Sequence, residues 1–307
     1  MTPHSSPSFT QASTPDFLII ANPISGSQAA PKLATRVKKL LQSNGASVEL
    51  RVTTARGDAR ILATEAVSLG VKAVVGCGGD GTLQEIACAL DGTQTAMGIL
   101  PGGRCNDFAH ALELKNSDSP ERLVQILQAN HRRAVDLGAI GDKRFLTVAT
   151  LGFDSEVSRF VETRKLWFKG TLAYAYGVLC VLKNFEAPRV RLKGDFGCFE
   201  GRVLLAATGN ASCYGGAMHI APDAKLDDGL FHLCVVDQVS RLTVLRILPR
   251  VLKGTHMHHP AVHMLTSHTV EIESPEGPLW ICADGESLTQ TPCRIEVRRG
   301  ALQVLVS

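Results

Sequence analysis

The five residues Gly78-Gly79-Asp80-Gly81-Thr82 follow an apolar run, residues 71–76, and precede a stretch of helical character, residues 83–90. Glycines at the end of a strand let the backbone approach a ligand closely and expose its N–H groups. At the N-terminus of a helix, such N–H groups favour phosphate. Asp80 adds a carboxylate, which suits the Mg²⁺ ion that a nucleotide carries. The segment therefore predicts a nucleotide-phosphate site where a strand meets a helix.

Other glycine-rich motifs fit the same segment less well. Residues 76–81 match the G-x-G-x-x-G pattern of dinucleotide-binding proteins, which requires an acidic residue at the end of the next strand. The next predicted strand, 95–100, is instead followed by Pro101-Gly102-Gly103. A P-loop is excluded because no Gly-Lys-Ser/Thr follows the glycines. A turn without a ligand is the remaining alternative, since glycine clusters often mark only a turn.

Two further strand ends carry the same kind of loop. Asn22-Pro23-Ile24-Ser25-Gly26 follows the apolar strand 17–21, and Leu-Pro-Gly-Gly-Arg-Cys-Asn-Asp-Phe at 100–108 follows the strand 95–100. All three loops combine glycine with Asn or Asp. In an open α/β sheet the carboxyl ends of the strands line one edge, where ligands bind. We therefore expect the three loops to converge on one ligand.

The chain divides into two predicted domains after a polar tail. Residues 1–15 are rich in Ser, Thr and Pro and are expected to be disordered. Residues 16–132 alternate strand and helix, which predicts an α/β domain with a parallel sheet covered on both faces. Residues 133–293 contain short β-type runs separated by turns, which predicts a mainly antiparallel β-sandwich. The last segment, 294–307, also has β character.

Composition narrows the classes of function. With 307 residues, of which 45% are hydrophobic, the chain is long enough for two domains with cores of their own. The formal net charge of +3 is too small to argue for a nucleic-acid partner. No apolar run is long enough to span a bilayer. Nine cysteines without a C-x-x-C pair indicate reduced thiols and a cytoplasmic location, rather than a disulfide framework or a zinc site.

Motifs spread from residue 17 to about residue 300 resemble those of the diacylglycerol kinase catalytic family, which includes the bacterial soluble lipid kinases and the sphingosine kinases. They occur in the same order as in that family. The resemblance implies a kinase that uses ATP and Mg²⁺, and a C-terminal strand, 294–307, part of which returns to the first domain. The matching segments are 22–26, Thr53 with 57–59, 78–82, 106–109, 221–224 with 228–229, and 284–286.

The resemblance also assigns contacts to the nucleotide. Asp80 is expected to hold Mg²⁺ through water, with Asp107 beside it, because Mg²⁺ keeps several of its waters. Arg104 departs from the family pattern Leu-Pro-x-Gly-Thr-x-Asn-Asp, in which Thr stands at this position; arginine still offers phosphate a charge and a forked pair of donors. The residues assigned to the nucleotide and its phosphates are Asn22, Pro23, Ser25, Gly26, Thr53, Gly78, Gly79, Asp80, Gly81, Thr82, Gly103, Arg104, Asn106 and Asp107.

A second acidic turn, Asp284-Gly285-Glu286, follows the predicted strand 279–283. A carboxylate on a tight turn at a strand end can point into a cleft between domains. Kinase chemistry needs one carboxylate to orient the acceptor hydroxyl and take its proton. By resemblance that residue is Asp284 or Glu286; Asp284 is favoured, with Glu286 supporting it, and the reverse order is left open. An ordinary hairpin turn is the alternative.

The loop at 221–231 is acidic, and by resemblance it holds a second, structural Mg²⁺. The ligands would be the carboxylate of Asp228 and the backbone carbonyls of Lys225 and Leu230, because oxygen ligands on a turn suit a hard cation. A solvated acidic turn without a metal explains the same residues equally well.

Cations beside aromatic residues suggest contact with a membrane surface. Such a mixture suits an anionic membrane, and it equally suits a helix end whose bases extend over a buried Trp. A peripheral membrane contact is therefore an expectation, and a homodimer is left open. The residues concerned are Arg159, Arg164, Lys165, Trp167, Phe168 and Lys169.

Together these features predict an ATP-dependent lipid kinase that transfers the γ-phosphate to a lipid hydroxyl, with diacylglycerol or a related glycerolipid as the favoured acceptor. One alternative is an enzyme similar to NAD kinases with a non-lipid acceptor, because the segment 78–82 also occurs in that family. The other alternative is a nucleotide- or lipid-sensing protein that does not catalyse transfer.

Overall fold

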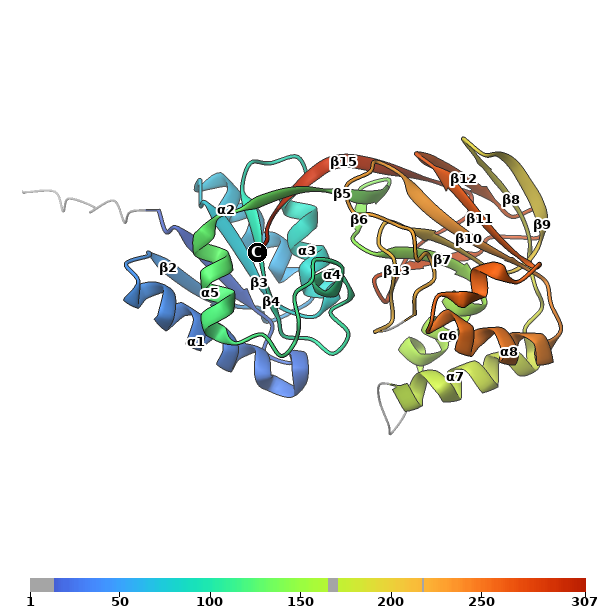
Figure 1. Cartoon of the computed structure of the whole chain (residues 1–307), viewed down its shortest axis with the longest axis horizontal. Helices are drawn as coiled ribbons and strands as arrows, with labels where there is room; N and C mark the ends of the chain where they lie inside the picture. The colour runs from blue at the N-terminus through green and yellow to red at the C-terminus, as the bar shows by residue number, and fades with distance from the viewer. Residues whose placement is uncertain (1–13, 165–170, 217) are drawn as a thin grey trace, which may run out of the picture.

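The computed structural model describes residues 14–164, 171–216 and 218–307. Two domains lie side by side and are joined by two long strands, β5 (Arg132–Ile140) and β15 (Cys293–Leu305) (Figure 1). The predicted tail lies outside the described residues except at positions 14 and 15. The predicted membrane-contact residues Lys165, Trp167, Phe168 and Lys169 also lie outside them.

The first domain is built on a parallel sheet with the order β2-β1-β3-β4, to which the end of β15 is added beside β4. Strands β1, β3 and β4 are apolar runs because both faces of the sheet are covered there, whereas the edge strand β2 alternates apolar and charged residues. Along β1, Leu18 and Ile20 enter one core, whereas Ile19 and Ala21 enter the other. The strands are β1 (Phe17–Ala21), β2 (Val48–Val52), β3 (Ala73–Gly78) and β4 (Ala96–Pro101).

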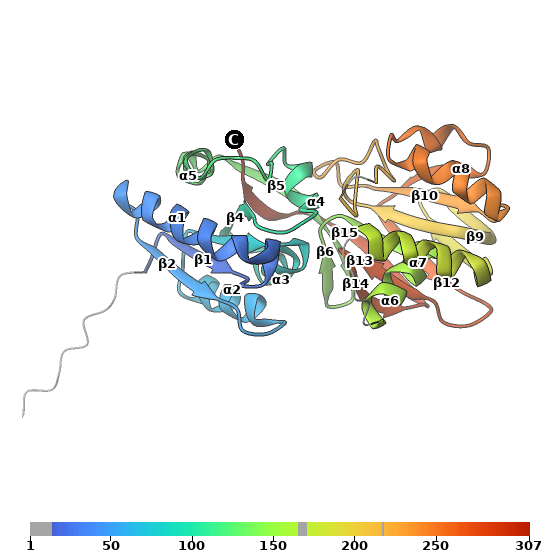
Figure 2. The same cartoon turned by 90° about the horizontal axis from the view of Figure 1, so that it is seen from below.

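Helices pack on both faces of this sheet (Figure 2). In α1, four buried residues at helical spacing, Ala30, Ala34, Val37 and Leu41, form the stripe that faces the strands. One face is covered by α1 (Ala29–Ser43), preceded by the short η1 (Ser25–Gln28), and by α5 (Pro120–Ala129). The other face is covered by α2 (Asp58–Ser68) and α3 (Asp80–Leu90), with the short α4 (Asp107–Ala111) beside them.

The second domain is a β-sandwich with antiparallel pairing throughout. The long strand β9 pairs with β8 through its first half and with β7 and β10 through its second half, so it contributes to both layers. The strands are β6 (Lys143–Phe145), β7 (Val148–Gly152), β8 (Arg189–Gly194), β9 (Gly197–Gly209), β10 (Phe231–Asp237), β11 (Val262–Ser267), β12 (Thr269–Glu273), β13 (Trp280–Ala283) and β14 (Glu286–Gln290).

Two apolar cores stabilise this domain. One fills the space between the strands, and the other lies between the strands and three helices that gather on one side of the sandwich (Figure 1). The helices are α6 (Phe153–Thr163), α7 (Thr171–Asn184) and α8 (Arg241–Val251), the last followed by the short η2 (Thr255–His258). The predicted combination of a parallel α/β domain with an antiparallel β-sandwich is confirmed.

Strand β15 connects the two domains. It pairs with β12 in the sandwich, then with β5, and near its end with β4, where Val304 lies opposite Met97. The pairing with β5 shifts register between Arg298 and Leu302, where Gly300 has φ +56° and donates its N–H to Asp136. This left-handed residue bends the strand toward the first sheet. The strand ends of both domains therefore face a common junction.

Candidate active site

The three glycine loops of the first domain touch one another. A Cβ atom added to Gly26, which has φ +57°, would lie 2.2 Å from the carbonyl oxygen of Gly102. A Cβ atom added to Gly103 would lie 2.4 Å from the Cα of Gly79. Glycine is required at these contacts because the backbones pack directly against each other. The predicted convergence of the loops at one edge of the sheet is therefore present in the structure.

Replacing Gly26 with Ala should separate these loops. The added methyl group collides with Gly102, and alanine is strained at this positive φ, so we expect a loss of more than about 2 kcal/mol of stability. Gly81→Ala is the matched variant, because its Cβ meets only the Glu286 carboxylate oxygen, at 3.5 Å. Thermal unfolding should show Gly81→Ala close to the wild type and Gly26→Ala clearly destabilised; equal unfolding of the two variants would contradict the close approach.

Asp80 occupies the start of α3 at the centre of these loops. Its Oδ2 accepts a hydrogen bond from the N–H of Asn106 at 3.1 Å. Desolvation, followed by repulsion from Asp107, raises the pKa of Asp80 to about 6. Burial likewise raises the pKa of Asp107, whose carboxylate accepts from the N–H of Gly216 in the second domain at 2.8 Å. Two neighbouring carboxylates that resist ionisation are stabilised by a bound cation.

The loop after β4 is organised by Asn106, which is fully buried and has φ +54°. Its side chain accepts from the N–H of Gly103 at 2.9 Å and donates to the carbonyl of Gly103 and to Asn116. The Asn106 amide thus fixes the loop from within, and its predicted contact with the nucleotide stays a prediction. Arg104 is exposed at the surface of the same loop.

One cavity, of about 250 Å³, opens on the first-domain side of the junction. At its edge the Asn22 amide donates to the Thr82 hydroxyl at 3.1 Å, which joins the first and second glycine loops. The sequence-predicted residues that line this cavity are Asn22, Pro23, Thr53, Gly81, Thr82 and Glu286. The remaining residues in its wall include Arg56 and Glu85, which were not predicted.

Arg56, just before α2, and Glu85 on α3 shape this cavity. Glu85 accepts from the N–H groups of Gly57 and Ala59 at 2.8 and 3.1 Å, so it stabilises the N-terminus of that helix. Arg56 donates to the carboxylate of Glu286, which belongs to the second domain. Neither residue lies within a recognisable motif. The Glu286 carboxylate is thus paired with a cation in the wall of this cavity.

Asp284 lies on the opposite side of the same turn. It has φ +50°, and its carboxylate accepts from the N–H groups of Leu146 and Thr147 at 2.7 and 3.0 Å and from the Thr147 hydroxyl at 2.6 Å. Desolvation raises the pKa of Asp284 to about 7 and outweighs these three hydrogen bonds, which lower it. A carboxylate with such a pKa is suited to accept a proton near neutral pH.

Asp284 lines a second cavity of about 200 Å³, together with Asp80 and Asp107. Adjacent residues line the two cavities, Asp80 and Gly81 on one turn and Asp284 to Glu286 on the other. Both cavities therefore adjoin these two turns. The arrangement would allow a group to pass between molecules bound in the two cavities, next to the Asp80 and Asp284 carboxylates.

The inner wall of the second cavity contains a polar cluster that was not predicted. Asp154 is buried and accepts hydrogen bonds from the hydroxyls of Tyr174 and Thr150, the latter at 3.0 Å, and Tyr214 also lines the cavity. Burial raises the pKa of Asp154. The available signal was its place directly after a strand, β7, the same signal that marked Asp80. This cluster gives the cavity a polar end.

The predicted structural metal loop lies apart from both cavities. Asp228 Oδ1 accepts from the N–H of Leu230 at 3.0 Å, and Oδ2 lies 3.1 Å from Nε2 of His232. Both carboxylate oxygens thus have protein partners, and the site at Lys225, Asp228 and Leu230 stays a prediction. Within the described part of the chain, no three His, Cys, Asp or Glu side chains gather closely enough to hold a metal ion.

Solved structures share this architecture. A putative diacylglycerol kinase from Bacillus anthracis strain Sterne superposes with a TM-score of 0.78, covering 97% of this chain and 99% of its own, at 22% identity. A second solved structure of a putative diacylglycerol kinase from the same strain gives a TM-score of 0.77 at 24% identity. The fold is therefore that of a two-domain protein of the diacylglycerol kinase type.

Sequence comparison gives the family. The model of the diacylglycerol kinase catalytic domain matches residues 16–140, and that of the YegS C-terminal NAD kinase beta sandwich-like domain matches residues 147–306. The chain is 34% identical to a diacylglycerol kinase of Mycobacterium tuberculosis over 93% of both chains. It is 35% identical to a probable lipid kinase YegS-like of Pseudomonas savastanoi over 86% of this chain and 85% of the relative. The chain belongs to the diacylglycerol kinase family of lipid kinases.

Proposed function

We propose that this lipid kinase transfers the γ-phosphate of ATP to the hydroxyl of diacylglycerol or a related glycerolipid. The observation that carries the proposal is the position of Asp284, whose pKa is raised to about 7, in the wall of the second cavity and on a turn that borders the first cavity through Glu286. The cavity beside Asn22 and Thr82 would hold the nucleotide. The cavity beside Asp284 would hold the acceptor hydroxyl.

The residues divide the reaction between them. Asp284 would orient the acceptor hydroxyl and take its proton as the oxygen bonds to the γ-phosphorus and the bond to the β–γ bridging oxygen breaks, which releases ADP. Backbone N–H groups of the three glycine loops and of the N-terminus of α3 would hold the phosphates. Arg56 pairs with Glu286 and would hold that carboxylate away from the acceptor, which favours Asp284 as the base.

Mg²⁺ fits the donor set at the junction. Asp80 and Asp107 are neighbouring carboxylates whose pKa values are raised mainly by burial, and they would hold the ion largely through water and phosphate oxygens. When bound, the ion would neutralise charge on the transferred phosphoryl group.

A groove on the second domain supports a lipid acceptor. The groove has a volume of about 620 Å³, lies between α6, α7 and β13, and includes Phe160, Phe185 and Trp280 in its wall. Arg159 stacks over the Trp280 ring at 4.8 Å. Aromatic walls suit acyl chains, and the basic side chains Arg164 and Lys183 in the same wall suit an anionic headgroup. The preference for a lipid over NAD also draws on the relatives, which are named diacylglycerol kinase and probable lipid kinase.

The proposal is tested with purified protein, Mg²⁺ and γ-labelled ATP, offered separately diacylglycerol in mixed micelles, a total lipid extract and NAD. We expect label in phosphatidic acid when diacylglycerol is supplied. Label on NAD alone would support the NAD kinase-like alternative. ATP binding without transfer to any acceptor would support the sensing protein.

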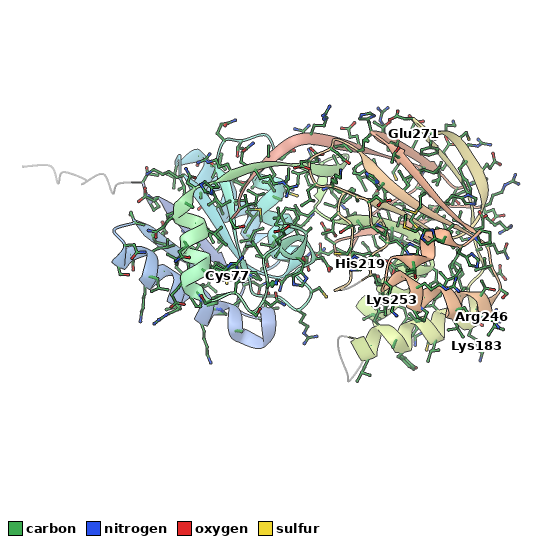
Figure 3. All side chains as sticks on the ribbon, in the orientation of Figure 1. Cys77, Lys183, His219, Arg246, Lys253 and Glu271 are labelled. Carbon is green, nitrogen blue, oxygen red and sulfur yellow. The ribbon has the colours of Figure 1, made fainter. Side chains whose placement is uncertain are left out.

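We further propose that α7 and α8 contact the membrane that supplies the lipid. Leu172 and Leu179 on α7 are 71% and 63% exposed, and Leu242 and Leu245 on α8 are 58% and 46% exposed. Lys183 on α7, Arg246 on α8 and Lys253 just after α8 lie on this helical side of the second domain (Figure 3). Exposed leucines fringed by cations suit an anionic bilayer surface. No helix among the described residues is long and apolar enough to cross a bilayer.

Charged substitutions on α7 should weaken this contact. Replacing both Leu172 and Leu179 with Glu removes apolar area and adds repulsion, so co-sedimentation with phosphatidylglycerol vesicles should fall roughly tenfold or more. Ile61→Glu is the control, because Ile61 is 59% exposed on α2 of the other domain. Unchanged vesicle binding in the double variant, or equal loss in the control, would contradict the assignment of this surface.

A further inference from the structure

Asp91, which directly follows α3, binds two guanidinium groups from the other side of the junction. Its Oδ2 lies 2.7 Å from Nε of Arg144, and its Oδ1 lies 2.9 Å from Nε of Arg298. The Asp91 side chain is only 8% exposed and that of Arg144 only 17%, whereas Arg298 is 41% exposed. The Asp91–Arg144 pair is thus largely withdrawn from solvent, where it is geometrically restrictive and costly to break.

Residues 144–147, the end of β6 and the bend that follows it, form the turn that holds Asp284, and Arg144 is the middle residue of β6. Two residues later, the N–H groups of Leu146 and Thr147 donate to the Asp284 carboxylate. The same turn is tied to α3 a second time, because the Gln84 amide donates to the carbonyl of Arg144 at 2.7 Å. Arg298, by contrast, lies on β15 and binds Asp91 without belonging to this turn.

Helix α3 therefore carries three functions in order. Asp80 at its N-terminus faces the phosphate loops, Gln84 lies one turn later, and Asp91 follows its last residue. The helix thus runs from Asp80, beside the glycine loops, to Gln84 and Asp91, the two residues that hold the turn at 144–147. Phosphoryl transfer requires the base and the phosphate to be aligned within a fraction of an ångström, although Asp284 and Asp80 come from different domains.

We propose that the Asp91–Arg144 ion pair, together with Gln84, positions Asp284 relative to Asp80. Asp91, Arg144 and Gln84 are positioning residues, since they act on Asp284 through the turn at 144–147 and line neither cavity. The catalytic part of this inference rests on the proposed kinase function. Its structural part, the fixing of the turn on α3, does not.

Arg144→Met and Arg298→Met form a matched pair, because each removes one guanidinium from Asp91 and only the first releases the turn. In hydrogen–deuterium exchange we expect faster exchange of the peptide covering 144–147 in Arg144→Met and not in Arg298→Met. Arg144 also donates to the carbonyls of Gly141 and Lys143 in its own hairpin. Gln84→Met is therefore measured as well, since it loosens the same turn from the helix side without changing charge.

The kinetic arm uses the same variants with ATP and diacylglycerol. We expect kcat to fall about 10- to 100-fold in Arg144→Met, less in Gln84→Met and within about twofold in Arg298→Met, with KM for ATP nearly unchanged. The hydrogen bonds from residues 146 and 147 lower the pKa of Asp284, so loosening them should also move the pH midpoint of kcat/KM upward.

The two arms separate the inference from the proposed function. Inactive wild-type protein would refute the kinase proposal, while the exchange data would still decide whether the turn is fixed by Asp91 and Gln84. Unchanged exchange at 144–147 in Arg144→Met, or equal changes in Arg298→Met, would refute the positioning role. Active protein in which Arg144→Met and Arg298→Met have equal kcat values would refute it as well.

Discussion

Asp284→Asn is expected to lower phosphoryl transfer by about 10²- to 10⁴-fold while MgATP binding stays within about twofold of the wild type. The amide cannot take a proton from the acceptor hydroxyl. It also places an N–H₂ group against one of the N–H donors of Leu146 and Thr147, which disturbs the orientation of the turn. The residues that line the cavity proposed for the nucleotide are unaffected. Steady-state kinetics with diacylglycerol micelles and calorimetric titration with MgATP measure the two effects separately.

Glu286→Gln is the companion variant, because Glu286 shares the turn and pairs with Arg56 in the cavity proposed for the nucleotide. We expect a smaller loss of kcat and a larger effect on KM for ATP. If Asp284→Asn keeps normal turnover and Glu286→Gln loses it, the two roles are reversed.

The pH dependence of the reaction gives a further check on Asp284. Desolvation raises its pKa to about 7, and only the deprotonated carboxylate accepts a proton. Activity should therefore be low below this pKa, rise as the pH increases through about 7, and level off above it. Bound Mg²⁺ would shift this limb to lower pH, since a nearby cation favours the carboxylate. A profile without this limb in the wild type would argue against Asp284 as the base.

Local sequence patterns were sufficient for the architecture of the first domain. The strands expected at 17–21 and 95–100 correspond to β1 and β4 within one residue. The expected strand at 71–76 instead continues to Gly78, because parallel pairing with β4 extends through the first glycine of the motif.

In the second domain, strands β11 and β14 were missed, because only one or two residues of each are buried and their apolar pattern is weak.

The parts of the site that the sequence did not reveal depend on contacts between distant residues. Asp154 is defined by its partner Tyr174, which lies 20 residues away in the chain. Asp91 meets Arg144 and Arg298 across separations of 53 and 207 residues. No local spacing encodes such pairs. Asn106 is the opposite case. It lies in a motif and was assigned to the ligand, but its side-chain amide forms hydrogen bonds to Gly103 and Asn116.

Asp80→Ala is expected to reduce kcat/KM for MgATP by roughly 10²- to 10³-fold, since several kcal/mol of charge stabilisation depend on a correctly held metal ion. The N–H of Asn106 fixes the Asp80 carboxylate at the start of α3. Asp80→Ala therefore removes this carboxylate from the glycine loops. Asp118→Ala is the control: its side chain is 7% exposed and also accepts a backbone N–H, that of Lys115, but it lines neither cavity. Titration of Mg²⁺ at fixed ATP should show a raised Mg²⁺ requirement in Asp80→Ala only.

The same substitution tests whether the two carboxylates act within one site. Repulsion from Asp80 is one of the effects that raise the pKa of Asp284, so in the metal-free protein Asp80→Ala should lower that pKa, as measured by NMR titration of the Asp284 carboxyl carbon. Asp118→Ala should leave that pKa in place. A reduced rate with an unmoved pKa would mean that Asp80 serves the metal without influencing the base, and an unchanged rate would remove Asp80 from the reaction. A change in both the rate and the pKa is expected only if the carboxylates of the two domains face a common space, because Coulomb coupling weakens as the two charges move apart.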